Sequence, residues 1–140
     1  MRATLSEIML FFRALPMATA AQGVKEDPLP KVIEKVLSRS GRGGVCAPAE
    51  AIRAAQRACS RWGRWFGGLD TCLTRSLVAG GLLAGSHEVV LHVGFRPTDR
   101  GADAVDGHAW LIVDGEALEL TGLNERHEEP YESSLQLRMG

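Results

Sequence analysis

The sequence predicts a single α+β domain, with helices in its first half and a small antiparallel sheet in its second. Before residue 84, apolar residues recur with helical spacing, and from Glu88 onward they alternate with polar ones as in a half-buried strand. Asp114-Gly115, between two strand-like runs, is a strong signal for a tight antiparallel hairpin. A chain of 140 residues with 45% hydrophobic content can bury a modest core. We place an N-terminal helical segment at residues 1–45 and the core at residues 46–140, together one compact domain.

The first half predicts three helices. Residues 5–15 are amphipathic, and we expect Pro16 to stop them because proline breaks a helix interior. A small-residue connector over residues 17–30 leads to a helix over residues 29–38. The third helix covers residues 48–64, with Pro48 in its first turn and Glu50 at its positive end.

A fourth helix is predicted to begin near Thr71, with Asp70 or Thr71 as its N-cap. Its unpaired backbone amides would point at the Cys72 sulfur, and their partial positive charge favours thiolate over thiol. Gly80-Gly81 lies within this helix, and we expect another backbone to approach closely there. Cys72 is therefore a candidate nucleophile.

The strands predict a partner for this cysteine. A strand covers residues 88–95, a loop covers residues 96–105, and a hairpin follows from residue 107 to residue 120. A two-residue turn places Val113 opposite Glu116, so that His108, Trp110, Glu119 and Thr121 share one face. His108 is then the candidate base, and Glu119 the carboxylate that orients it, with Asp106 as the alternative. Residues 124–140 are mostly polar, and we expect them to pack loosely.

Two other interpretations of the cysteines are open. Cys46 and Cys59 are typical of small buried side chains, without the spacing of a zinc site or the density of a disulfide scaffold. Cys72, His108 and a third ligand could instead hold a metal, although only long-range spacing supports that. We expect no cofactor and no metal, and a reduced, cytoplasmic protein.

Three motifs resemble the leader peptidases of lasso-peptide biosynthesis, a branch of the transglutaminase-like cysteine proteases. They are Cys72-Leu73-Thr74-Arg75-Ser76-Leu77, the strand that ends Gly94-Phe95-Arg96-Pro97, and His108-Ala109-Trp110 with Val113-Asp114-Gly115. The resemblance covers residues 48–120 and implies a papain-like core with Cys72 as nucleophile and His108 as base. The family's third residue is usually an aspartate where this chain has Leu120, with Glu119 beside it.

The resemblance implies that the protein removes the leader from a ribosomally made precursor peptide through a thioester acyl-enzyme. A separate lasso cyclase would then use the new amino terminus of the core. Residues 1–45 are too short and too poor in strands for a leader-recognition module, so we expect a separate leader-recognition protein. The alternatives are acyl transfer to an amine and a non-catalytic module that binds a peptide or a partner.

Charge and hydropathy exclude some partners. A net charge of −1 gives no overall attraction to nucleic acid, and the apolar run at residues 8–12 is too short to span a membrane or to act as a signal peptide. One basic stripe stands out, at Arg53, Arg57, Arg61 and Arg64, near Trp62 and Trp65. It is either a solvated helix face or a docking site for an acidic peptide or partner.

Overall fold

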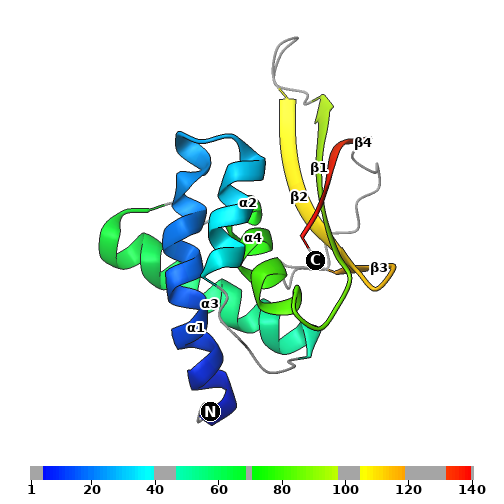
Figure 1. Cartoon of the computed structure of the whole chain (residues 1–140). Coiled ribbons are helices and arrows are strands. Elements are labelled where there is room, and N and C mark those ends of the chain that lie inside the picture. Colours follow the sequence, from blue (N-terminus) through cyan, green and yellow to red (C-terminus); the bar gives the residue numbers. More distant parts are fainter. Residues whose placement is uncertain (1–4, 40–46, 69–70, 98–104, 119–131, 140) are drawn as a thin grey trace.

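The computed structural model describes residues 5–39, 47–68, 71–97, 105–118 and 132–139. Helices pack on one side of a four-stranded antiparallel sheet with the strand order β3-β2-β1-β4 (Figure 1). The α+β prediction is therefore confirmed.

Helix α1 (Leu5–Ala21) is longer than predicted, because it continues through Pro16. The expected stop at Pro16 was wrong. A proline inside a helix costs about 3 kcal/mol, but the turn that follows it buries Met17, Ala18 and Ala21 completely. Burial of that turn against the core offsets the cost. A short 3-10 helix (Gln22–Lys25) then leads to α2 (Leu29–Ser38), which has the predicted bounds.

Helix α4 (Cys72–Leu83) lies at the centre of the fold. It packs against α1, α2 and α3 (Pro48–Phe66) and also against the sheet, and residues 76–83 are all buried. The Gly80-Gly81 pair does mark a close approach, but side chains make it, not the backbone we expected. A Cβ on Gly80 would meet Met139, and one on Gly81 would meet Met17 and Val36.

The central hairpin agrees with the prediction. Strand β2 (Val105–Val113) turns through Asp114 and Gly115 into β3 (Glu116–Leu118), with Val113 opposite Glu116. Asp114 and Gly115 have φ angles of 50° and 86°. Positive values at both central positions are typical of the type I′ turn that a two-residue hairpin favours.

The C-terminal segment is not loose, and that expectation was wrong for residues 132–139. They form β4 (Glu132–Arg138), which pairs antiparallel with β1 (Val89–Pro97), and Met139 is 3% exposed. The Met139 amide donates to the Val89 carbonyl oxygen at 2.8 Å. Pairing with the outer edge of β1 gives the segment backbone hydrogen bonds that its polar composition does not reveal.

The two faces of the sheet differ. Leu91, Ala109 and Leu111 are buried on the face that packs against α4. His92 and Trp110, which are paired across β1 and β2, project from the opposite face because side chains alternate along a strand.

Candidate active site

The start of α4 is fixed by the side chain of Thr71. Its Oγ1 accepts a hydrogen bond from the Thr74 amide at 3.2 Å, and the Thr74 hydroxyl oxygen accepts one from the Thr71 amide at 2.9 Å. This reciprocal capping satisfies two backbone donors that the first helical turn leaves unpaired. Of the two predicted caps, Thr71 is the one that the structure uses. It places Cys72 at the first helical position, as the sequence predicted.

Cys72 is half-buried, and its thiol faces strand β2. The Cys72 Sγ accepts a hydrogen bond from the Ala109 backbone amide at 3.4 Å. The Ala109 nitrogen is bonded to the carbonyl carbon of His108, so the His108 Cα lies within about 6 Å of the sulfur by bond geometry. The structure therefore brings Cys72 together with the part of β2 that carries His108, across 36 positions of sequence.

The His108 imidazole belongs to an aromatic row on the other face of the sheet. Its ring stacks on Trp110 at a centroid separation of 5.7 Å and an interplanar angle of 21°. His92, from β1, stacks on the same indole at 5.5 Å and 29°. Trp110 thus stacks against two imidazoles, one from its own strand and one from β1.

The third member of the predicted constellation is not located. Glu119 and Thr121 lie outside the described residues, and so does the side chain of Asp106. Cys59 is fully buried in the core, as expected, whereas Cys46 is outside the described residues. Within the part of the chain that the structure describes, no cluster of three or more histidine, cysteine or acidic side chains could hold a metal.

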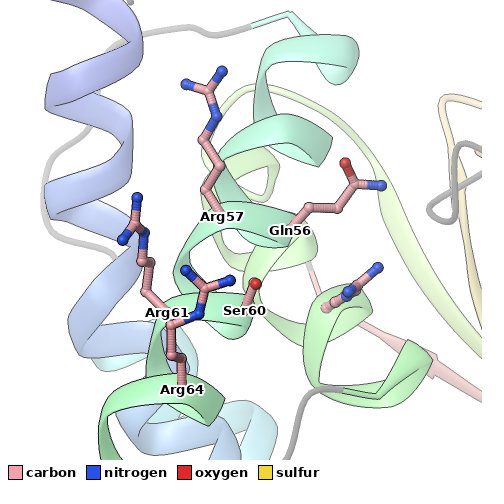
Figure 2. A pocket seen from close by; sticks show the side chains of 6 residues that line it. Gln56, Arg57, Ser60, Arg61 and Arg64 are labelled. Carbon is pink, nitrogen blue, oxygen red and sulfur yellow. The ribbon is translucent and has the colours of Figure 1, made fainter.

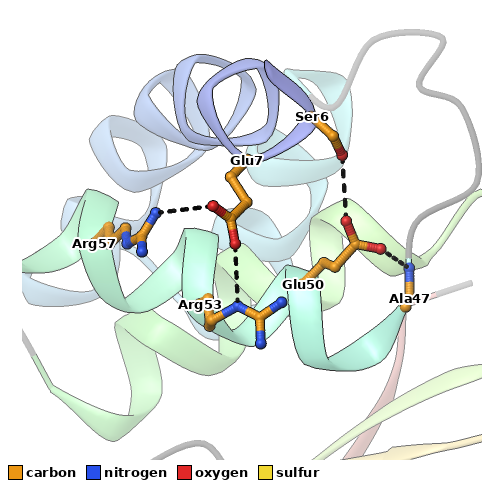
Figure 3. A network of polar contacts seen from close by, with 6 residues as sticks. All are labelled: Ser6, Glu7, Ala47, Glu50, Arg53 and Arg57. Carbon is orange, nitrogen blue, oxygen red and sulfur yellow. Dashed lines mark hydrogen bonds and ion pairs between the residues drawn. The ribbon is translucent and has the colours of Figure 1, made fainter. Parts of the chain in front are cut away.

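The predicted basic stripe of α3 separates into two parts. Arg53 and Arg57 approach Glu7 of α1, with nitrogen to oxygen distances of 3.7 and 3.9 Å (Figure 3). These pairs are exposed, so each contributes only about 0–1 kcal/mol. The network also includes Glu50, whose carboxylate accepts from Ser6 Oγ and from the Ala47 amide at 3.3 Å each. This end of the stripe therefore joins α1 to α3, a role that neither of the two interpretations from the sequence included.

The other end of the stripe lines an open groove of about 410 Å³. Figure 2 shows the side chains of Arg57, Arg61 and Arg64 extending from α3 beside Gln56 and Ser60. Arg75 of α4 completes the lining. The helical spacing of the stripe did not indicate Arg75, because Arg75 belongs to another helix.

A second polar contact holds the end of β2. Asp114 Oδ2 lies 2.7 Å from His87 Nδ1, and Asp114 Oδ1 accepts from the Glu88 amide at 2.9 Å. The hydrogen bond with His87, followed by that from Glu88, keeps the pKa of Asp114 below its ordinary value of 3.8. Asp114 therefore links the hairpin to the turn between α4 and β1, and it is not available to orient His108.

Comparison with known families matches residues 15–131 to the transglutaminase-like superfamily. The matched range contains both Cys72 and His108. The chain belongs to the transglutaminase-like superfamily. Proteins of this superfamily are typically cysteine peptidases or acyltransferases.

Neither the curated proteins nor the solved structures that were compared include a significant match. Family membership therefore establishes the fold, and the reaction must be argued from the site. Among the described residues, no helix combines the length and the apolarity needed to cross a membrane.

Proposed function

We propose that this transglutaminase-like protein is a cysteine peptidase that removes the leader from a lasso-peptide precursor. The observation that carries the proposal is the hydrogen bond of 3.4 Å between the Ala109 amide and the Cys72 sulfur. It joins the helix start that bears the thiol to the strand that bears His108. The motif resemblance around these two residues supports the choice of a leader peptide as substrate.

In the proposed reaction, His108 takes the thiol proton as the Cys72 sulfur attacks the carbonyl carbon of the scissile bond. The resulting oxyanion receives a hydrogen bond from the Cys72 backbone amide, which has no partner within the helix at this position. His108 then gives its proton to the leaving amine, and a thioester to the leader remains. Finally, His108 activates water, which hydrolyses the thioester and frees the leader.

The His108 ring must reach the sulfur for this reaction. In the structure the ring stacks on Trp110, on the sheet face opposite α4, so the reaction requires it to leave that stack and turn toward Cys72. The distance of about 6 Å from sulfur to Cα is within the reach of an imidazole, and catalytic hydrogen bonds often tighten only when substrate binds. Glu119 is the proposed carboxylate that orients the ring, with Asp106 as the alternative. A separate leader-recognition protein would hold the precursor and raise the local concentration of the scissile bond.

The test is a cleavage assay read by mass spectrometry. The protein is mixed with its precursor and the leader-recognition protein, and the masses of leader and core are followed. We expect Cys72→Ala and His108→Ala to abolish the leader fragment. His92→Ala is the matched control, because His92 stacks on the same indole but lies on β1. Cleavage that persists in Cys72→Ala, or is lost equally in His92→Ala, contradicts these roles.

The same thioester could pass its acyl group to an amine, which is the other reaction typical of this superfamily. Adding glycinamide to the assay separates the two reactions. A peptidase releases the leader as a free acid, whereas an acyltransferase releases an amide heavier by the mass of the added amine less water. A module that only binds a peptide would give neither product.

A further inference from the structure

The groove between α3 and α4 has an unusual lining. All six side chains that line it are polar, and four of them are arginines: Gln56, Arg57, Ser60, Arg61, Arg64 and Arg75. The chain as a whole has a net charge of −1, so this concentration of positive charge is local. A groove lined by basic and neutral polar residues, with no acidic one, is suited to an anionic ligand held by ion pairs and hydrogen bonds.

Two of the groove arginines, Arg61 and Arg64, are not neutralised by the residues that the structure describes. Glu7 lies near Arg57, but it is shared with Arg53. Among the described residues, no carboxylate lies within ion-pair distance of Arg61 or Arg64. Arg61 instead sits over the Trp65 ring at 5.8 Å, where an aromatic face can hold the planar guanidinium. Guanidinium groups pair with carboxylates through two parallel hydrogen bonds, so the groove matches acidic side chains in geometry as well as charge.

One lining residue of the groove, Arg75, lies on the same helix as the candidate nucleophile. Arg75 follows Cys72 by three positions on α4, and residues at that spacing are neighbours on a helix surface, with Cβ atoms about 5–6 Å apart. An extended peptide advances about 3.3 Å per residue. A substrate whose scissile carbonyl is at Cys72 would therefore reach Arg75 within about two or three residues.

We propose that this groove binds acidic side chains of the polypeptide substrate, within a few residues of the scissile bond. The proposal rests on the peptidase function above. A nucleic acid is the less suitable occupant, because Glu7 and Glu50 lie at the N-terminal end of the basic stripe (Figure 3). These two glutamates limit the basic site to a short length, which is suited to one or two carboxylates. Their negative charge would repel a continuous phosphate backbone.

The first test measures binding in the full-length Cys72→Ala variant, which removes the thiol. A short glutamate-rich peptide carrying a neutral dye is titrated by fluorescence anisotropy beside a glutamine peptide of equal length and a single-stranded DNA. We expect the glutamate peptide to bind about tenfold more tightly than the glutamine peptide. Its affinity should fall as the salt concentration rises, because salt screens ion pairs. Arg61→Glu with Arg64→Glu should remove this preference.

Two further variants act as controls. Arg39→Glu makes the same charge reversal at an exposed position at the end of α2, outside the groove, and should leave binding unchanged. Arg61→Gln with Arg64→Gln removes charge without reversing it, and should lower affinity even if the double reversal fails to fold. Equal binding of the glutamate and glutamine peptides, tighter binding of the DNA, or an equal loss in Arg39→Glu would each overturn the proposal.

The second test asks whether the groove acts at Cys72. Alkylation of the wild-type thiol by anionic iodoacetate and by neutral iodoacetamide is followed by peptide mass mapping. Positive charge beside the sulfur should raise the rate ratio of iodoacetate to iodoacetamide, and Arg75→Gln should lower that ratio several-fold. An unchanged ratio in Arg75→Gln would overturn the placement of the groove beside the nucleophile.

The outcomes separate the two proposals. Binding of the acidic peptide is measured in a variant that lacks the thiol. If that variant does not prefer the glutamate peptide, the proposal for the groove is rejected, and the cleavage assay still tests the peptidase function separately. If instead Cys72→Ala still cleaves the precursor, the peptidase mechanism fails whatever the groove binds.

Discussion

Substitution of Gly81 by alanine tests the packing that holds α4 in place. A Cβ at this position would lie 2.9 Å from Met17 Sδ and 2.9 Å from Val36 Cγ1. Both neighbours are fully buried. Val36 is β-branched, so its side chain has little rotational freedom within α2 and cannot easily withdraw. We therefore expect the added methyl group to strain the contact between α2 and α4.

The size of the effect follows from two opposing contributions. Carbon atoms pack best at about 3.5–4.0 Å, so a Cβ at 2.9 Å overlaps its neighbours, and overpacking of this kind costs about 1–3 kcal/mol. Alanine is also the better helix former, by about 1 kcal/mol. The net loss of unfolding free energy is about 1 kcal/mol, which corresponds to a decrease in Tm of about 3–4 °C for a chain of this length.

The assay is urea unfolding followed by far-UV circular dichroism, on three alanine variants. Gly80→Ala should cost less than Gly81→Ala, because its nearest neighbour is the flexible end of Met139, at 2.5 Å. Gly85→Ala is the control. A Cβ there meets nothing within 4 Å, so this variant should be neutral or slightly stabilised.

A double variant shows whether Val36 is the cause. Val36→Ala removes the group that the new Cβ meets. Val36→Ala should therefore lower the free energy of unfolding less in the Gly81→Ala background than in the wild type. If Gly81→Ala is as stable as the wild type, or if the two changes are simply additive, then α2 and α4 do not pack as closely as described.

Three other substitutions test separate features. Asp114→Asn keeps a residue suited to the turn but removes the carboxylate that is hydrogen-bonded to His87 and to the Glu88 amide. Because these hydrogen bonds depress the folded pKa of Asp114, their contribution to stability is full above pH 3.8 and is lost as pH falls through the folded value. Urea midpoints of the variant and wild type should therefore differ at pH 7 and converge well below 3.8. Thr71→Ala should cost about 1 kcal/mol by removing the cap of α4, whereas Thr19→Ala, at an exposed helical position, should change stability by less than about 0.5 kcal/mol; an equal cost would argue against capping. Pro16→Ala should raise Tm, since it restores an α1 hydrogen bond that proline lacks, and an unchanged or lower Tm would show that the helix gains nothing from it.

Features set by a few neighbouring residues could be predicted accurately. The start of α4 depends on Thr71 and its partner Thr74, three positions away, and the hairpin depends on Asp114 and Gly115. These residues carry their own conformational preferences, so their sequence is enough to place a helix start or a turn.

Features set by distant contacts were the ones predicted wrongly or missed. Pro16 should end α1, yet burial of the following turn keeps the helix intact. Residues 132–138 are polar enough to suggest a loose tail, yet the outer edge of β1 pairs with them. In both cases contacts with residues remote in sequence stabilise the element, and the local sequence pattern does not show those contacts.

For the site, the sequence by itself determined which groups carry the chemistry: a cysteine at the first position of a capped helix, and a histidine within a strand. The types of these residues and the motifs around them can be read directly from the amino-acid sequence. Only the tertiary structure decided that the Cys72 sulfur meets β2 at Ala109, and that Arg75 joins the α3 arginines around one groove. The physical reason is that hydrogen bonds and electrostatic attraction depend on distances in space, and packing α4 against both α3 and the sheet is what sets those distances.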